Sequence, residues 1–213
     1  MATCYSVSLF NEVAQHLKYE NYHFFMDVKQ GVIHFGISTK GNINNIQYHI
    51  IVKDSWFVTY AVFPISGDIR DKNQMTELSK YLHIINCNLL HGSCELDLRD
   101  GEIRIKYFVN CDGIIPSEEI IEDSVQCPAA IFDRYGKGIL GIIFNHMNAE
   151  EAVQFCERPI YTADPGCNTN SGDSNENEDY IPLDALDFLD SLFDNYDDLD
   201  ESDPYSDPYD DIK

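Results

Sequence analysis

The stretch Cys94–Asn110, CELDLRDGEIRIKYFVN, decides the fold predicted for this chain. We read it as a β-hairpin, because Asp100-Gly101 is a strong signal for a two-residue type I′ turn and apolar residues alternate on both sides of it. The outward residues carry opposite charges across this hairpin and are expected to pin its register weakly. They are Glu95, Asp97, Arg99, Arg104 and Lys106.

Four further strands are predicted upstream, within residues 23–63. HFFMDV and VIHFGIS flank Gln30-Gly31, which we read as a second two-residue turn because glycine supplies the positive φ that such turns need. NIQYHIIV and SWFVTYAVF follow. In these segments apolar residues alternate with more polar ones, as expected for an antiparallel sheet with one buried and one wetter face.

Three helices are predicted around these strands. The first spans residues 8–19 with Ser8 as its cap, and the second spans residues 72–86 with Asp71 or Asn73 as its cap. The third begins at Pro116-Ser117-Glu118-Glu119, capped by Ser117. Pro128 is expected to kink it, and a break is expected at three glycines before the helical stripe of residues 139–157. The glycines are Gly136, Gly138 and Gly141.

The predicted fold class is therefore α+β, an antiparallel sheet flanked by helices in the order αββββαββα. Composition divides the chain into an α+β domain (1–158), a flexible linker (159–180), an acidic amphipathic helix (181–199) and a disordered acidic tail (200–213). Residues 161–213 hold 17 Asp or Glu and one Lys, which is −16 of the net charge of −23 and leaves −7 for residues 1–160. This balance argues against binding to nucleic acid or to anionic membranes.

The segment IPLDALDFLDSLFDNYDDL (181–199) is the candidate partner-binding element. Its apolar residues fall at helical spacing, with aspartates between them. These residues are Leu183, Leu186, Leu189, Leu192 and Phe193. Such a stripe fits against its own domain, a dimer mate or another protein. A solubilising tail with a transient helix fits the pattern equally well.

The seven cysteines and seven histidines do not predict a metal site. No C-x-x-C, H-x-x-x-H or H-E-x-x-H spacing occurs, although closed zinc sites usually show such pairs. Cys87, His91 and Cys94 come nearest, without an evident fourth ligand. No cofactor is therefore expected.

Catalytic motifs are equally weak. Ser55, Cys111 and Cys127 lack the sharp strand-to-helix turn of an activated nucleophile. The formal G-x-G-x-x-G that starts at Gly136 lacks the preceding strand of a dinucleotide site, so a helix break is favoured. With no signal peptide in view and an odd, scattered set of cysteines, the cytoplasm is the expected compartment.

The order αββββαββα, the hairpin LRDGEIRIKYFV and the segment CDGIIPSEEIIEDS before a long helix together resemble the bacterial YbjN-like family of sensory transduction regulators. The resemblance covers about residues 5–157. It implies a fold similar to the class I chaperones of type III secretion: a compact domain, commonly dimeric, that binds a segment of a partner. It implies no catalytic residues.

The leading hypothesis is a non-enzymatic protein-binding regulator or chaperone-like adaptor, in which the tail helix is a docking or autoinhibitory element. A homodimer is compatible with it, and no nucleic acid or membrane partner is expected. Two alternatives stay open. One is a small enzyme or ligand-binding domain whose site is assembled from distant residues, and the other is an acidic tail that mimics nucleic acid and blocks a basic protein.

Overall fold

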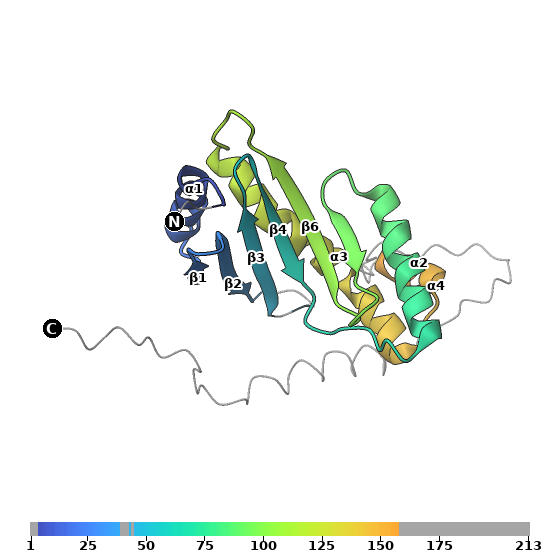
Figure 1. Cartoon of the computed structure of the whole chain (residues 1–213). Helices are drawn as coiled ribbons and strands as arrows, with labels where there is room; N and C mark the ends of the chain where they lie inside the picture. Colours follow the sequence, from blue (N-terminus) through green and yellow to red (C-terminus); the bar gives the residue numbers. More distant parts are fainter. Residues whose placement is uncertain (1–3, 39–42, 44, 158–213) are drawn as a thin grey trace, which may run out of the picture. The chain divides into compact units, whose positions relative to one another are not determined.

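The computed structural model describes residues 4–38, 43 and 45–157 (Figure 1). The chain divides into two units, Met1–Tyr161 and Thr162–Lys213, and the description below concerns the first. The predicted linker, acidic helix and tail lie outside the described residues.

An antiparallel sheet of six strands with four helices forms the described part of the chain, which confirms the α+β class. The helices are α1 (Val7–Tyr19), α2 (Lys72–Asn88), α3 (Glu118–Asn145) and α4 (Ala149–Glu157). The strands are β1 (Phe24–Asp27), β2 (Val32–Ile37), β3 (Ile46–Val52), β4 (Trp56–Val62), β5 (Ser93–Leu96) and β6 (Ile103–Asn110). Helix α4 is additional to the predicted order.

The strands lie in the order β1-β2-β3-β4-β6-β5, so the two predicted hairpins form the two edges of the sheet. Both predicted two-residue turns are wrong. The ladder of the first hairpin ends at Asp27↔Val32 and that of the second at Leu96↔Ile103, leaving longer connections.

Both turns begin at an aspartate that ends the ladder early. The Oδ1 atom of Asp27 accepts from the backbone N–H of Lys29 (3.0 Å), and that of Asp97 accepts from Arg99 (2.9 Å). Each aspartate carbonyl then accepts from a glycine N–H four residues on, at 2.9 Å in the first turn and 2.8 Å in the second. The glycines, Gly31 and Gly101, have φ of 71° and 81°, so the predicted need for positive φ is correct.

The two edge hairpins are related by an approximate twofold axis. Three register pairs of the first hairpin correspond to three of the second at an offset of 70 residues: Phe24↔Phe35 to Cys94↔Ile105, Phe25↔His34 to Glu95↔Arg104, and Met26↔Ile33 to Leu96↔Ile103. In the centre of the sheet Phe35 pairs with Tyr48, Ile105 pairs with Ala61, and Tyr48 pairs with Ala61. The axis therefore passes between β3 and β4.

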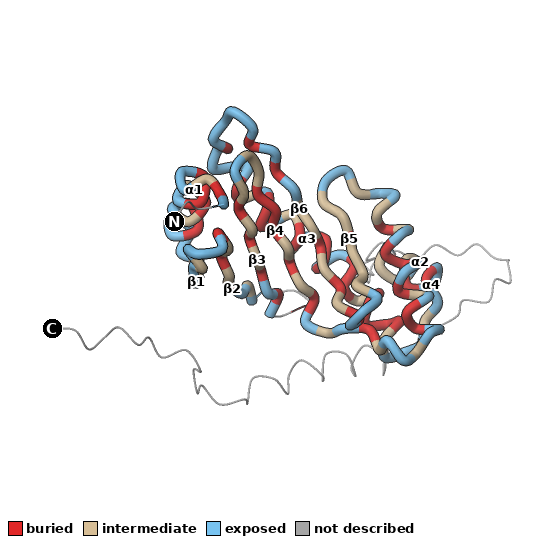
Figure 2. The backbone as a smooth tube through the Cα atoms, in the orientation of Figure 1, coloured by how far each residue is buried: buried red, intermediate tan, exposed pale blue. Residues whose placement is uncertain are grey.

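One face of the sheet packs on α3, which runs behind the strands in Figure 1. On this face Ile46, Tyr48, Ile50 and Val52 are fully buried, and the alternation of buried and less buried residues along β3 is visible in Figure 2. Two hydrogen bonds join the layers: Tyr48 Oη donates to the carbonyl of Val125 (2.9 Å), and Thr59 Oγ1 bonds Ser124 Oγ (3.1 Å). The core therefore lies between the sheet and α3.

Helix α3 runs without a break to Asn145, so the predicted break at the glycines is wrong. The glycines serve close packing instead. A Cβ on Gly136 would lie 2.5 Å from the Ile43 side chain, one on Gly138 2.1 Å from Tyr81 Oη, and one on Gly141 2.6 Å from Met147 Sδ. A Cβ at any of these positions would therefore require the neighbouring side chain to move. The three glycines are therefore accounted for by close packing of α3 against neighbouring side chains, of which Tyr81 lies on another helix.

The helix caps agree with the sequence only in part. Ser6, two residues before the predicted cap, accepts from the N–H of Leu9 at 3.3 Å and begins α1. Asp71 caps α2 as expected, accepting from Asn73 and Gln74 at 3.0 Å each. Ser117 precedes α3, but its side chain makes no capping hydrogen bond.

Helix α2 closes the outer edge of β5. The side-chain amide of Asn86 donates to the Cys94 carbonyl (2.9 Å) and accepts from the Cys94 N–H (2.7 Å). These two bonds occupy the backbone groups through which another strand would pair, as proteins commonly do at sheet edges.

Candidate partner-binding face

The face of the sheet opposite α3 is the candidate site, and we call it the open face. Strand register determines its members, because every second residue of each strand points to it. They are Phe25, Asp27, Val32, His34, Gly36, Gln47, His49, Ile51, Trp56, Val58, Tyr60, Val62, Ser93, Glu95, Arg104, Lys106, Phe108 and Asn110. In Figure 1 no described helix lies in front of β3, β4 and β6 on this side.

One end of the open face is apolar and aromatic. The Trp56 and Phe108 rings lie 5.6 Å apart, and Phe108 is 54% exposed. Val58, opposite Phe108 in the register, is buried, and Ile51 lies beside it on β3. An antiparallel sheet with one uncovered face usually turns polar residues outward. Apolar residues here therefore mark a surface suited to binding another molecule.

The other end of the open face is charged but internally paired. Arg104 Nε lies 2.9 Å from Glu95 Oε2, and Lys106 Nζ lies 3.2 Å from Glu95 Oε1. Arg104 also contacts Glu102 at 3.2 Å and places its guanidinium 4.7 Å from the centre of the Tyr60 ring. The predicted cross-strand pairing of charges is thus correct for Glu95 and Arg104, which are register partners.

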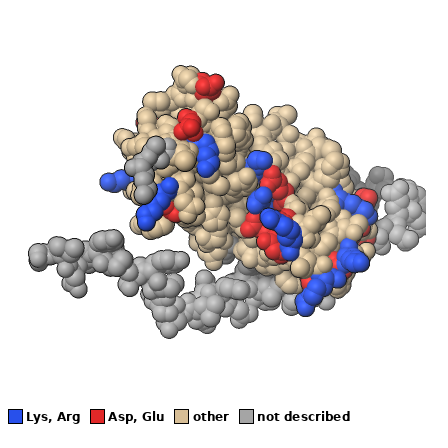
Figure 3. Space-filling view, in the orientation of Figure 1, with Lys and Arg blue, Asp and Glu red and all other residues tan. Residues whose placement is uncertain are grey.

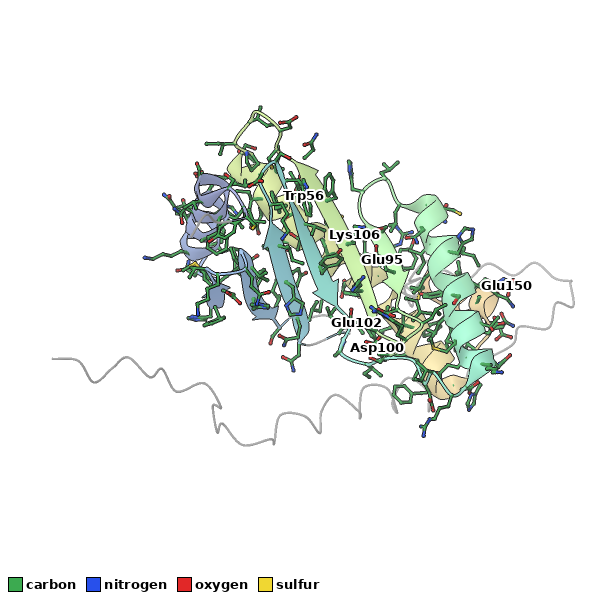
Figure 4. All side chains as sticks on the ribbon, in the orientation of Figure 1. Trp56, Glu95, Asp100, Glu102, Lys106 and Glu150 are labelled. Atoms are coloured by element: carbon green, nitrogen blue, oxygen red, sulfur yellow. The ribbon has the colours of Figure 1, made fainter. Side chains whose placement is uncertain are left out.

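Charged groups lie on both sides of the view in Figure 3. Figure 3 shows Lys, Arg, Asp and Glu clustered over β5 and β6, while the middle of the sheet is largely free of them. Figure 4 places Glu95 and Lys106 close together there, with Glu102 and Asp100 towards the hairpin end and Trp56 at the start of β4. The open face therefore has a neutral centre with a charged margin.

Two histidines occupy the centre of the β2–β3 half. His34 and His49 are direct cross-strand partners, and their Nδ1 atoms lie 2.7 Å apart. The rings meet edge-on with centroids 4.9 Å apart, between Phe25 on β1 and Tyr60 on β4. Burial lowers the pKa of His49, and the proximity of His34 lowers it further. Sequence spacing did not single out this pair, since the residues are 15 positions apart and only strand register joins them.

A second polar cluster joins α1 to α3. His16 Nε2 lies 2.8 Å from Glu122 Oε2, while Tyr22 (3.2 Å) and Gln126 (2.8 Å) donate to Glu122 Oε1. His16 is buried, and its Nδ1 has no hydrogen-bond partner among the described residues. Burial and the Glu122 carboxylate raise the pKa of Tyr22 to about 12. The cluster joins two helices, and residue spacing could not predict it, because 106 residues separate His16 from Glu122.

The sequence candidates for metal binding are not brought together. Cys87 is exposed, and Cys94 is buried against α2. The His91 ring is stacked with the Tyr107 ring, with 6.4 Å between their centroids. Across the described residues, no group of three or more His, Cys, Asp or Glu side chains has metal-site geometry.

The two cysteines considered as nucleophiles, Cys111 and Cys127, are not activated by their surroundings in the described structure, and neither is Cys94. Burial raises the pKa of Cys94 to about 12 and raises the pKa values of Cys111 and Cys127. A raised pKa keeps the thiol protonated, whereas a nucleophile needs the thiolate.

The candidate residues of the acidic stripe lie outside the described residues, so their placement is not part of this site. They are Leu183, Leu186, Leu189, Leu192 and Phe193. Among the helices that are described, none is both long enough and apolar enough for a membrane span. No protein-family model and no curated protein matches the chain.

Proposed function

We propose that the protein is a non-enzymatic adaptor or chaperone-like regulator that receives a segment of a partner protein on its open face. One observation carries this proposal: the face of the sheet that no described helix covers carries the exposed Phe108 and the half-buried Trp56 and Ile51 where a solvated sheet would present polar residues. The resemblance to the YbjN-like family and to class I secretion chaperones supports the same role. We assign the protein to the cytoplasm on its cysteine pattern.

The distribution of charge supports this face over the helical layer as the site for an acidic or apolar partner. Helix α3 contains five Asp or Glu and two Lys or Arg, and α4 contains three Glu, so these helices together carry −6. The six strands contain two acids and two bases and are neutral. Acidic segments are repelled by the helical layer and meet no such barrier at the sheet.

The acidic segment 181–199 enters the proposal on its sequence pattern alone, as a docking or autoinhibitory element that competes with the partner. A second copy of the chain is another occupant that the test below must distinguish.

The test is an affinity pull-down that compares the proteins bound by the full-length wild-type chain with those bound by two single variants of it. Phe108→Asp places a charge on the open face, while Phe144→Asp places the same charge at a 42% exposed position on α3. We expect the wild type and Phe144→Asp to retain a common partner that Phe108→Asp loses. Equal retention by all three would exclude the open face. Circular dichroism must show that both variants are folded.

The retained partner is then titrated while the fluorescence of Trp56, the sole tryptophan, is followed. Docking over Trp56 is expected to change its emission. Sedimentation of the free protein shows whether a second copy occupies the face, and a chain ending at residue 158 is expected to bind the partner more tightly if 181–199 competes.

A further inference from the structure

The two edges of the sheet are closed differently, although their hairpins are alike. At the β5 edge, the outward N–H and C=O groups of Cys94 are both bonded by the Asn86 side chain. At the β1 edge, the residue in the equivalent register position is Phe24. The same offset of 70 residues relates Asn86 to His16 on α1, but His16 bonds Glu122 on α3 instead. In the described part of the chain, the β1 edge therefore lacks the closure that α2 gives to β5.

The hydrogen bonds of β2 show which backbone groups of β1 point outward. The N–H of Val52 donates to the Gly31 carbonyl at 2.8 Å, so odd-numbered residues at this end of β2 bond β3. In an antiparallel strand the bonding direction alternates, and the even-numbered residues of β2 therefore bond β1. Their register partners on β1 are Phe25 and Asp27, so these two residues hold β1 on the sheet.

The residues between them, Phe24 and Met26, point their N–H and C=O groups away from β2. Among the described residues, none of these four backbone groups has a hydrogen-bond partner. The side chains along this edge are also exposed, with Phe25 at 69% and Met26 at 41%. A row of unpaired backbone groups beside exposed apolar side chains is a template for another strand.

We propose that two copies of this chain pair antiparallel through β1, with the Phe25 residues of the two copies opposite each other on a twofold axis. In this register Phe24 of each copy faces Met26 of the other, and each such pair exchanges two N–H···O=C bonds. The four bonds use every outward N–H and C=O of these residues. The two sheets become continuous, and the two open faces lie on the same side.

Neighbouring registers meet backbone groups that are already bonded. Moving the axis one residue towards the turn sets Phe24 against Val28, whose carbonyl accepts from Tyr5 Oη at 2.6 Å. Moving it one residue the other way sets Met26 against Tyr22, whose N–H donates to the last turn of α1 at 2.9 Å. The register centred on Phe25 therefore satisfies the edge best.

Side chains are also complementary in this register. The two Phe25 residues form a non-hydrogen-bonded pair, the kind in which opposite side chains lie closest, so each covers the exposed ring of the other. Asp27 of each copy faces His23 of the other, which places an acid opposite a group that can carry positive charge. No two like charges are opposed along β1.

The edge fits a second copy better than a flexible segment of another protein. Strand β1 has four residues, so a flexible segment gains few bonds there while losing about 1–2 kcal/mol of conformational freedom per ordered residue. A second copy brings a strand that β2 already orders. Because α2 closes the β5 edge, pairing also stops at two copies and does not extend into a fibre.

Sedimentation of the full chain over a micromolar concentration series tests the proposal, and we expect a monomer–dimer equilibrium. Met26→Pro removes one outward N–H from each copy, which deletes two of the four bonds and should weaken association about tenfold or more. Phe25→Lys opposes two ammonium groups at the axis and should have a similar effect. The matched control, Phe108→Lys, changes an exposed residue of the open face on β6 and should dimerise like the wild type.

Amide hydrogen exchange checks the register. The N–H groups of Phe24 and Met26 should exchange more slowly as the concentration of the wild type rises, and Phe25→Lys should abolish this change. A chain that stays monomeric throughout, or a dimer that Phe108→Lys breaks and Phe25→Lys leaves intact, would overturn the inference. Circular dichroism must show that the variants are folded; Phe25→Lys changes an exposed side chain and keeps the test decisive if Met26→Pro unfolds. Retention of a partner on the open face is measured separately, so either proposal can fail alone.

Discussion

The carboxylate of Glu122 on α3 links this helix to α1. Burial alone would raise its pKa, but hydrogen bonds from His16, Gln126 and Tyr22 lower it below the usual glutamate value. These bonds join α1 and the residues after it to α3. Glu122 is therefore a stabilising anion between two elements that are distant in the sequence.

Replacing Glu122 with glutamine is expected to lower the free energy of unfolding by about 1–3 kcal/mol at pH 7, because hydrogen bonds to a charged acceptor become bonds to a neutral one. A lowered folded-state pKa stabilises the protein above the unfolded value near 4.5 and ceases to do so as the pH falls. The difference in unfolding free energy between wild type and variant should therefore begin to narrow as the pH falls below about 4.5, and part of it should be lost at pH 4.

Urea unfolding at pH 7 and pH 4 measures both effects. Glu118→Gln, at the exposed first residue of α3, is the control and should change stability little. An equal loss at both pH values would show that the Glu122 charge is not what stabilises the contact.

At the scale of elements, the long helix α3 packs closely against its neighbouring helices. Gly138 faces Tyr81, whose hydroxyl donates to the Tyr135 carbonyl at 2.7 Å, so the ring has no freedom to retreat. The same hydroxyl lies 3.3 Å from Cys156 Sγ on α4. Three helices thus meet at one glycine.

Gly138→Ala is expected to destabilise the fold by about 1–3 kcal/mol, the usual cost of overpacking, despite the better helix propensity of alanine. Thermal unfolding checks it. The matched control is Gly36→Ala, whose Cβ would meet only the flexible amide of Gln47 at 3.3 Å. A Gly138→Ala protein as stable as the control would mean that the helices can separate without cost.

The alternation of apolar and polar residues and the amphipathic stripes were enough to predict the strands, the first two helices and the α+β class. An element that is buried on one face has apolar residues that recur at its own period. The α3 glycines were wrongly predicted to break the helix. A single sequence cannot distinguish a glycine that breaks a helix from one that leaves space for a neighbouring ring, as Gly138 does for Tyr81. Both turns were misread because Asp27 and Asp97 end the ladders through side-chain bonds that Gly31 and Gly101 alone do not signal. The His34–His49 pair depends on the pairing of strands, which residue spacing does not encode.

At the scale of the described domain, the sheet has a similar hairpin at each edge and two faces that differ from each other. The turns that close the edge hairpins share the same hydrogen bonds and the same positive φ at glycine. The faces differ: one is covered by an acidic helical layer, and the other is a neutral surface with aromatic residues. Similar edge hairpins thus flank two faces that differ in charge and in the helices packed on them.

Substitution of either turn glycine by alanine is expected to cost about 1–3 kcal/mol for the strained φ alone. Gly101→Ala should be the more damaging, because its Cβ would meet the backbone oxygen of Gly67 at 2.0 Å, whereas that of Gly31 would meet the Tyr5 ring at 2.6 Å. The turns lie at opposite edges, so the losses in the double variant should add to within about 0.5 kcal/mol. Denaturant unfolding of the three variants measures these changes in unfolding free energy. Strong non-additivity would mean that the two edges are energetically coupled.

The offset of 70 residues between the edge hairpins also bears on descent. Each hairpin follows a helix by four residues, and each contributes an edge strand and its inner neighbour. Fusion of two copies of a half-length ancestor, once paired as a dimer through the strands that became β3 and β4, would produce this arrangement. On that history His34 and Arg104, which hold equivalent register positions in the two edge hairpins, would descend from one position.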